Sequence, residues 1–411
     1  MDLIDRECAV CRQDDHVEVF DQPTGAIIGI GDIGYHHRIQ LCRRCGFVFA
    51  APVLTEKMIF SFYEKMSNYE QPQHRGQRPQ PEIDQIHRYV QLISRRFPEG
   101  FRGKALDIGC ATAYGLSLFK ARGWDVLGLD PSARCVALSK QCYDVRVIQG
   151  FFDPAVLIPE KPFDLIVLCH VLEHLLHPDK MLDDLNGLLS ENGRVYIEVP
   201  DLMKPYAQKC YFGFEHVNFF TPVTLTNLAR AHGFAVDSLS TFDNGPQISP
   251  FYPVIGVTLS KSGKKSALNN DYADVLPVIE KFKSGSMRLM ARLQALISGI
   301  IEQTPKGRLA LWGAGIHTSQ LLSETALGQT PLACIFDNDP KKRGSFLQGH
   351  PVESFTGNIE DVKKRIDAIL ISSEASENDI YQQIGHLEGH GIRIYRLYQE
   401  EKNNDNMEKC S

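Results

Sequence analysis

Hydrophobic positions along the chain alternate between two spacings, and this alternation predicts an α/β protein with two sheet-forming regions. Between residues 104 and 260, short β-rich apolar runs are separated by stretches with helical spacing, which is typical of a doubly wound sheet. A second, smaller region of the same kind covers about 306 to 398, a second Rossmann-like domain. The runs predicted as strands are KALDI, WDVLGLD, VRVIQG, FDLIVLC and GRVYIEVP in the first region, and RLALWGAG, LACIFDND, DAILISS and IRIYRLY in the second.

Two further segments have helical spacing. Apolar residues recur every three or four positions over 82–97, which predicts an amphipathic helix leading into the first region. A longer helix is expected over about 274–302, where it would bridge the two regions. Before the first helix, residues 55–80 turn from aromatic to rich in Pro and Gln, so we expect a linker or a lid there.

Length and charge exclude several classes of function. The chain has 411 residues, enough for two or three domains, and 43% of them are hydrophobic. Its net charge of −6 leaves no basic excess, so neither a nucleic acid nor an anionic membrane is expected as a partner. Asp2 and Asp5 stand where a signal peptide would be basic, and no apolar run approaches the roughly 20 residues of a membrane span. We therefore expect a cytoplasmic location.

Four of the eleven cysteines form two tight pairs, Cys8-x-x-Cys11 and Cys42-x-x-Cys45. Two such turns supply four thiolates for one tetrahedral zinc ion, with no coordination position left for water, so the ion would be structural. Two unrelated pairs are the alternative, and a redox role is disfavoured because no thioredoxin-like pattern surrounds them. A zinc-dependent DNA-binding module is also disfavoured, because acidic residues surround its arginines.

These features divide the chain into four parts. We expect a zinc-binding module and linker over 1–80 and a nucleoside-binding α/β domain over 81–260. The bridging helix and the second Rossmann-like domain would cover 272–400. The last residues, 401–411, lack apolar side chains and are expected to be disordered.

The chemistry concentrates where the first two strands of the first region end. Residues 106–115 read LDIGCATAYG, and the next strand ends in GLDPS at 128–132. Ligands of open parallel sheets bind at this edge, where a turn of small residues lets the backbone come close and an acid on the next strand grips a ribose. A nucleoside ligand is therefore expected between Gly109 and Asp130.

These residues resemble the first and second motifs of the class I S-adenosylmethionine (SAM)-dependent methyltransferases. The resemblance continues in FDLIVLCHVLEHL at 163–175, where HVLEHL would begin a helix. It departs from the family pattern at Ala111 and Ala113, where glycine is usual. By this resemblance Asp107 and Gly109 would lie against the methionine part of SAM and Asp130 against its ribose. The full set of expected cofactor-binding residues is Asp107, Gly109, Cys110, Ala111, Thr112, Asp130, Pro131 and His170.

A second candidate site follows the last predicted strand of this region, in FEHVNFFTP at 214–222. An adjacent Glu-His pair between aromatic residues is a plausible general base with its orienting carboxylate, although a surface loop anchored by its aromatic side chains has the same pattern.

The order of zinc module, SAM domain and second Rossmann-like domain resembles the sugar C-methyltransferases that act on nucleotide-linked keto-sugars. The resemblance implies catalytic roles for His174, Glu215 and His216. It also implies a substrate-binding tyrosine, Tyr63 or Tyr69, in the segment before the SAM domain. The family has another tyrosine two positions before the glutamate, where this chain has Gly213.

In the mechanism that we expect, His216 removes the proton next to the sugar carbonyl, Glu215 orients it, and His174 lies near the developing oxyanion. O-methylation of a sugar or small molecule is one alternative, and an inactive SAM- or nucleotide-binding protein is another. Gly313-Ala314-Gly315, followed by Asp337, would bind the nucleotide of the sugar or serve only as scaffold. The sequence indicates neither the acceptor nor the oligomeric state.

Overall fold

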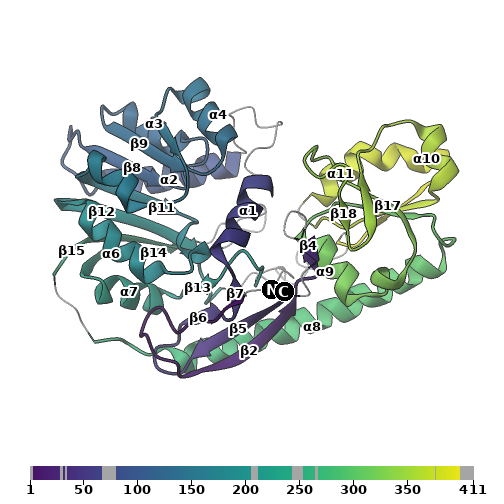
Figure 1. The fold of residues 1–411 in the computed structure, drawn as a ribbon, viewed down its shortest axis with the longest axis horizontal. Coiled ribbons are helices and arrows are strands. Elements are labelled where there is room, and N and C mark those ends of the chain that lie inside the picture. Colours follow the sequence, from purple (N-terminus) through teal and green to yellow (C-terminus); the bar gives the residue numbers. More distant parts are fainter. Residues whose placement is uncertain are drawn as a thin grey trace, which may run out of the picture.

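The computed structural model of the protein describes residues 3–27, 31–32, 35–66, 80–204, 212–242, 253–263, 267–374 and 376–398. Figure 1 shows an α/β unit at each end of a long molecule, with the long helix α8 and the N-terminal strands between them. The expected tail, 401–411, lies outside the described residues.

The first α/β unit is built on a seven-stranded sheet with the order β10-β9-β8-β11-β12-β15-β14. Its first five strands are parallel and reverse their order between β8 and β11, so the crevice for a ligand opens at the carboxyl ends of these two strands. All five predicted strands of the region are confirmed here. The strands are β8 (Lys104–Ile108), β9 (Asp125–Asp130), β10 (Val147–Gln149), β11 (Phe163–Cys169), β12 (Leu189–Pro200), β14 (Phe234–Phe242) and β15 (Val254–Lys261).

Helices pack on this sheet largely where helical spacing predicted them. One expectation is wrong: the HVLEHL segment does not begin a helix but forms a 3-10 turn, Leu172–His174. The following helix begins only at Pro178, because proline is well suited to the first helical position, where no N–H is needed. The helices of the unit are α2 (Gln80–Ser94), α3 (Tyr114–Lys120), α4 (Ala133–Tyr143), α5 (Pro154–Leu157), α6 (Pro178–Leu188) and α7 (Pro222–Ala231).

The second α/β unit repeats the same strand order on a smaller scale. Its sheet runs β18-β19-β17-β16-β20-β21, and all of its neighbouring strands are parallel except β18 and β19. The four predicted strands are confirmed, so the expected second Rossmann-like unit is present. Its elements are β16 (Leu309–Trp312), β17 (Leu332–Phe336), β18 (Phe346–Leu347), β19 (His350–Glu353), β20 (Ala368–Ile371), β21 (Arg393–Arg396), α9 (Ile316–Glu324), α10 (Ile359–Arg365) and α11 (Glu377–Ile384).

The N-terminal segment forms an antiparallel sheet of its own, and one strand of that sheet comes from far along the chain. The order is β13-β6-β5-β2, so residues 218–219 of the methyltransferase-like segment complete the N-terminal sheet. The segment expected to be a linker instead contains the helix α1. The elements are β1 (Leu3–Ile4), β2 (His16–Pro23), β3 (Ala26–Ile27), β4 (Gly31–Asp32), β5 (His36–Cys42), β6 (Val48–Ala50), β7 (Val53–Leu54), β13 (Asn218–Phe219) and α1 (Glu56–Met66).

Several hydrogen bonds hold the loop before β13 between the N-terminal sheet and the first α/β unit. The Ala50 amide donates to the Val217 carbonyl at 3.0 Å, and the Val217 amide donates to the Glu173 carbonyl at 2.9 Å. The buried Arg6 guanidinium donates to the same Val217 carbonyl and to the Asn218 side-chain oxygen. The loop containing Glu215 and His216 is therefore tied to both sides.

The long helix α8 (Tyr272–Glu302) confirms the predicted bridge. Its 31 residues, at about 1.5 Å each, span roughly 46 Å. The first half buries Val275, Ile279 and Phe282 against the N-terminal sheet, and the second half buries Leu293 and Ile297 in the second α/β unit. One amphipathic helix therefore contributes to two hydrophobic cores.

The N-terminal segment also reaches the second α/β unit directly. Ala26 of β3 is buried in that unit's core, and the Ser319 hydroxyl of α9 donates to the carbonyls of Thr24 and Ala26. The N-terminal module thus contacts both α/β units. Within the described ranges, the structure has no helix that is long and apolar enough to cross a membrane.

The fully buried His37 on β5 generates a prediction about pH. Its Nε2 donates to the His216 carbonyl at 3.0 Å, its Nδ1 lies 2.9 Å from the Tyr35 hydroxyl, and burial lowers its pKa from 6.5 to about 4. As the pH falls from 6.5 towards 4, His37 becomes protonated in the unfolded chain but not in the folded protein. Protonation stabilises the unfolded chain, so the free energy of unfolding falls.

We expect the free energy of unfolding to fall more steeply with decreasing pH in the wild type than in His37→Gln. The difference between the two slopes should be up to about 1.4 kcal/mol per pH unit. Urea unfolding at several pH values measures this difference. His36→Gln, at the neighbouring and exposed position, is the matched control and should keep the wild-type slope. Equal slopes in all three proteins would contradict the assignment.

Candidate functional site

A cavity of about 360 Å³ opens at the carboxyl edge of the first sheet, a size that suits a small-molecule ligand. Its floor is formed by the ends of β8, β9 and β11, where the strand order reverses. The helices α1 and α2 supply one side, and the loop before β13 supplies another. The cavity therefore lies where the sequence predicted a nucleoside ligand.

The turn between β8 and α3 brings the backbone close to the cavity. Gly109 has φ of 72°, and a Cβ there would lie 2.7 Å from the Val171 side chain, so only glycine fits. Ala111 and Ala113 also have positive φ, 47° and 58°. This conformation explains why glycine is usual at these two positions, and it costs an alanine about 1–2 kcal/mol.

Asp130, at the end of β9, fixes that turn. Its carboxylate accepts the Ala111 amide at 2.8 Å through one oxygen and the Ser132 amide at 2.9 Å through the other. A carboxylate oxygen can accept more than one hydrogen bond, and Asp130 also lines the cavity. Asp130 thus both shapes the turn and faces the ligand space.

The predicted cofactor-binding residues converge here with one exception. Asp107, Gly109, Cys110, Ala111, Asp130, Pro131 and His170 all line the cavity. Thr112 is buried behind the turn and does not line it.

Sequence reasoning missed the aromatic side chains around the opening of the cavity. Phe60 of α1 stacks on Phe151 of the loop after β10, with ring centroids 3.7 Å apart, and Tyr89 and Tyr114 also line the cavity. A helical pattern shows that α1 and α2 have an apolar face, but it does not show which surface that face covers.

The structure also adds Glu173, which sequence reasoning treated only as part of a motif. Its side chain is 1% exposed, and one of its oxygens lies 3.2 Å from His170 Nδ1. Burial opposes ionisation, yet the hydrogen bond from His170 and the nearby histidines lower the pKa of Glu173 to about 2. Burial likewise acts to lower the pKa of His170, but the bond to Glu173 raises it above 6.5. The two residues are therefore joined by a hydrogen bond between the partly buried His170 and the buried Glu173.

The three predicted catalytic residues lie together on the wall of this cavity. His174 Nδ1 donates to the Glu215 backbone carbonyl at 2.8 Å, and the His174 and His216 rings meet edge to face with centroids 4.7 Å apart. Burial, reinforced by His174, lowers the pKa of His216 to about 3, and burial raises the pKa of Glu215. Of the expected substrate tyrosines, Tyr63 lies on α1 without a described side chain, and Tyr69 lies outside the described residues.

A buried polar network behind the cavity fixes α2. Glu198, at the end of β12, is fully buried and accepts hydrogen bonds from Tyr196 at 2.7 Å, Arg88 at 3.1 Å and Gln85 at 2.5 Å. The Gln85 amide nitrogen also lies 3.1 Å from His170 Nε2. Helix α2 is therefore connected to the sheet edge through charged groups, which restricts its position over the cavity.

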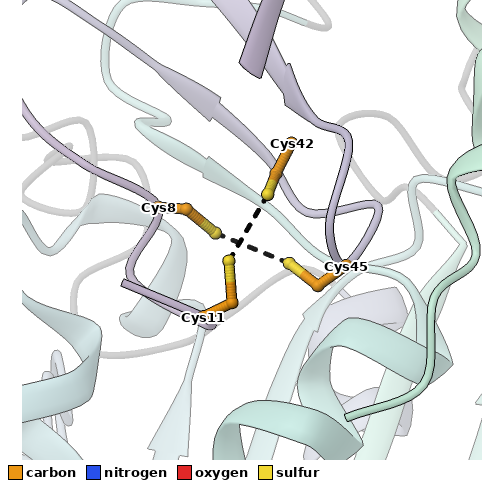
Figure 2. A group of neighbouring side chains, drawn as sticks. All are labelled: Cys8, Cys11, Cys42 and Cys45. Atoms are coloured by element: carbon orange, nitrogen blue, oxygen red, sulfur yellow. Dashed lines mark hydrogen bonds between the residues drawn. The ribbon is translucent and has the colours of Figure 1, made fainter. Parts of the chain in front are cut away.

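The four paired cysteines form a second site. Figure 2 shows their thiols pointing at one centre from two turns, and all four sulfur atoms lie within 4.8 Å of one another. Both turns have the same backbone bond: the Arg12 amide donates to the Cys8 carbonyl, and the Gly46 amide donates to the Cys42 carbonyl. The Cys8–Cys45 and Cys11–Cys42 sulfur separations are both 3.5 Å.

Comparison with known proteins agrees with this geometry. Residues 81–239 match the model of a family described as a methyltransferase domain. The chain is 27% identical over 106 residues to a ubiquinone biosynthesis O-methyltransferase of Glaesserella parasuis. That match covers 24% of this chain and spans less than half, 45%, of the relative.

Similar solved structures include a SAM-dependent methyltransferase from Mesorhizobium loti, with 17% identity, a TM-score of 0.35 and coverage of 41% of this chain and 95% of that one. Magnesium protoporphyrin IX methyltransferase from Synechocystis is 13% identical, with a TM-score of 0.40 and coverage of 51% of this chain and all of the other. The family match covers the part of the chain that has the reversal of strand order and the Asp130 turn, and it identifies residues 81–239 as a methyltransferase domain.

Proposed function

We propose that the protein is a SAM-dependent methyltransferase that methylates a carbon atom of a nucleotide-linked keto-sugar. The observation that carries this proposal is that Glu215, His216 and His174 share one cavity with the Asp130 turn. A methyl donor at the turn and an acceptor at the histidines would meet inside it. We also propose a cytoplasmic location, the setting in which such activated sugars are made.

The residues at the turn fit SAM. Asp107 and the positive-φ backbone at Gly109 suit the methionine part, and the Asp130 carboxylate, which lines the cavity, suits the ribose hydroxyls. Bound SAM supplies a methyl group on a sulfonium, which is transferred by in-line displacement. The protein then needs mainly to align the acceptor and exclude water, and the Phe60–Phe151 stack and α2 cover the cavity for that purpose.

Carbon becomes nucleophilic only after losing a proton, and Glu215 and His216 are the groups placed to accept it. We expected His216 to act as the base and Glu215 to orient it. The raised pKa of Glu215 and the pKa of about 3 of His216 make the carboxylate the stronger base of the pair. We therefore propose that Glu215 takes the proton and that His216 and His174 face the carbonyl oxygen.

Proton removal and methyl transfer need no further reagent. Glu215 accepts the proton from the carbon beside the carbonyl, and His174 lies where it can stabilise the resulting oxyanion. A carbon–carbon bond to the methyl group then forms as the carbon–sulfur bond breaks. The carbonyl is restored, and the proton leaves Glu215 for solvent.

The second α/β unit supports a nucleotide-linked acceptor. Its first turn repeats the arrangement at Asp130: Asp337 accepts the Ala314 amide at 2.7 Å and the Asp339 amide at 2.8 Å. This is the sheet edge where α/β units bind nucleotides. We propose that the unit recognises the nucleotide while the sugar reaches the first cavity.

The four-cysteine cluster suits structural zinc. Zinc–sulfur bonds of about 2.3 Å in a tetrahedron separate the sulfur atoms by roughly 3.8 Å, close to the separations present. Four thiolates leave no position for substrate, so we propose that the ion holds the N-terminal module together and takes no part in the transfer.

O-methylation is the second candidate, and two observations favour it. The matched curated relative is an O-methyltransferase, and this chain has Gly213 where the sugar C-methyltransferases have a tyrosine. An oxygen acceptor needs only a single base, which the same cavity supplies.

SAM binding tests the first part of the proposal. Asp130→Ala should weaken SAM binding by roughly 10- to 150-fold, because a hydrogen bond to a charged group contributes about 1.5–3 kcal/mol. Calorimetric titration of the purified protein with SAM measures this effect. Asp125→Ala, at the exposed start of the same strand, should bind like the wild type, and equal affinity of all three proteins would remove Asp130 from the site.

Metal content tests the four-cysteine cluster. Elemental analysis should find one zinc ion per chain fewer in Cys42→Ser than in the wild type. Amides of β13, residues 218–219, should then exchange hydrogen at least tenfold faster, because β13 pairs with β6 of the N-terminal sheet. Cys142→Ser, an exposed cysteine on α4, should keep the zinc and the protection. Unchanged zinc in Cys42→Ser would rule out this cluster.

Product analysis tests the reaction. Glu215→Gln should lower kcat by about 10²- to 10⁴-fold without changing SAM affinity, since it removes only the proton acceptor. His177→Ala, outside the cavity, should retain full activity. Carbon NMR of the product made with labelled SAM locates the methyl group: attachment to carbon supports C-methylation, and attachment to oxygen establishes the second candidate.

A further inference from the structure

Three side chains on the wall of the cavity form a cluster, and the proposed reaction gives a role to only two of them, His174 and His216. Donor atoms of Glu173, His174 and His216 all lie within 4.8 Å of one another, and Glu173 Oε1 is 3.9 Å from His174 Nε2. Two of these residues come from the 3-10 turn after β11, and the third comes from the loop before β13. All three line the cavity.

The hydrogen bonding and the position of the two histidines suit metal ligands. A backbone carbonyl can only accept, so the bond from His174 to Glu215 O places the proton on Nδ1 and the lone pair on Nε2, towards Glu173. Metal-binding histidines typically make such a bond through their other nitrogen. The His216 ring lies edge to face with the His174 ring, with centroids 4.7 Å apart, which brings a second imidazole to the same place.

Glu173 has an oxygen that nothing in the described part of the chain satisfies. Oε1 bonds to His170, but Oε2 is buried and has no hydrogen-bond partner among the described residues. An ionised oxygen buried without a partner costs a few kcal/mol, so such a group is expected to have one. A cation between the three side chains would supply it.

We propose that Glu173, His174 and His216 bind a divalent first-row transition-metal ion in this cavity. Two imidazoles and one carboxylate favour such an ion over Mg²⁺ or Ca²⁺, which prefer oxygen ligands throughout. The site differs from the four-cysteine cluster in donor set and in openness, because three protein ligands leave coordination positions free on the cavity side.

The ion suggests which acceptors the cavity takes, an extension that rests on the proposed function. Free positions on the metal suit a substrate that presents a carbonyl oxygen, alone or with a neighbouring hydroxyl, next to the carbon that loses its proton. With His216 as a ligand, Glu215 is the group of the adjacent pair that remains to accept the proton.

Cobalt titration of the full-length protein, loaded with zinc at the cysteines, tests the site. One equivalent of Co²⁺ should bind and give visible d–d absorption bands without the thiolate charge-transfer bands that cobalt at the cysteines would produce. Glu173→Gln and His174→Ala should each weaken Co²⁺ binding at least tenfold. His177→Ala, nearby on the same segment but outside the cavity, should bind Co²⁺ like the wild type.

SAM titration of the same variants separates loss of the metal site from loss of the fold. Glu173→Gln keeps the shape of the side chain, so unchanged SAM affinity with lost Co²⁺ binding supports the proposal. Absence of Co²⁺ binding in wild-type protein that binds SAM overturns it, as does equal Co²⁺ affinity in wild type and both variants.

A methyl-transfer assay distinguishes failure of the metal-site proposal from failure of the proposed function. Co²⁺ binding without transfer to any keto-sugar would keep the metal site and overturn the proposed acceptor. Full transfer by protein that carries zinc only at the cysteines would overturn the role of the second ion and leave the methyltransferase assignment intact.

Discussion

The pairing of β13 with β6 is the contact on which the rest of the site depends. It joins residues 218–219 to 48–49, so the loop before it lies between the N-terminal sheet and β11. Val217 makes this explicit, because its carbonyl accepts from Ala50 and Arg6 while its amide donates to Glu173. Glu215 and His216 owe their place beside His174 to a sheet in a different part of the chain. The four cysteines therefore support the active cavity although they lie outside it.

The same dependence extends to the second α/β unit. Helix α8 buries one half against the N-terminal sheet and the other half in the second unit, and β3 enters that unit's core. Figure 1 shows the helix running from beneath β2 and β5 towards β17 and α9. The second unit and the loop that contains Glu215 and His216 therefore contact the same N-terminal module.

Sequence reasoning succeeded where the determinants are local. Strand and helix spacing predicted nine of the thirteen strands in the sheets of the two regions, and the turn at Asp107–Thr112 predicted the edge where the cavity opens. It failed where distant segments meet. Nothing local to residues 218–219 indicates that they pair with β6, and nothing in HVLEHL shows that it forms a 3-10 turn that points Glu173 inward. The contribution of α1 to the cavity wall was missed for the same reason, since an apolar helix face does not show which surface it covers.

The two α/β units hold their first turns with the same set of hydrogen bonds, which explains how alanine is tolerated in the first turn of the first unit. Gly109 and Gly313 each donate to the residue before the aspartate, both at 2.8 Å, and each aspartate holds two further amides. Charged acceptors strengthen these bonds, so they offset the roughly 1–2 kcal/mol that Ala111 loses at positive φ. The two units differ in what else lies beside the aspartate carboxylate. Asp337 is paired with Lys342 at 2.9 Å, whereas Asp130 lines a cavity. The lysine adds a cation beside the second turn, where the phosphates of a nucleotide would lie, while the first turn keeps its carboxylate for hydroxyl groups.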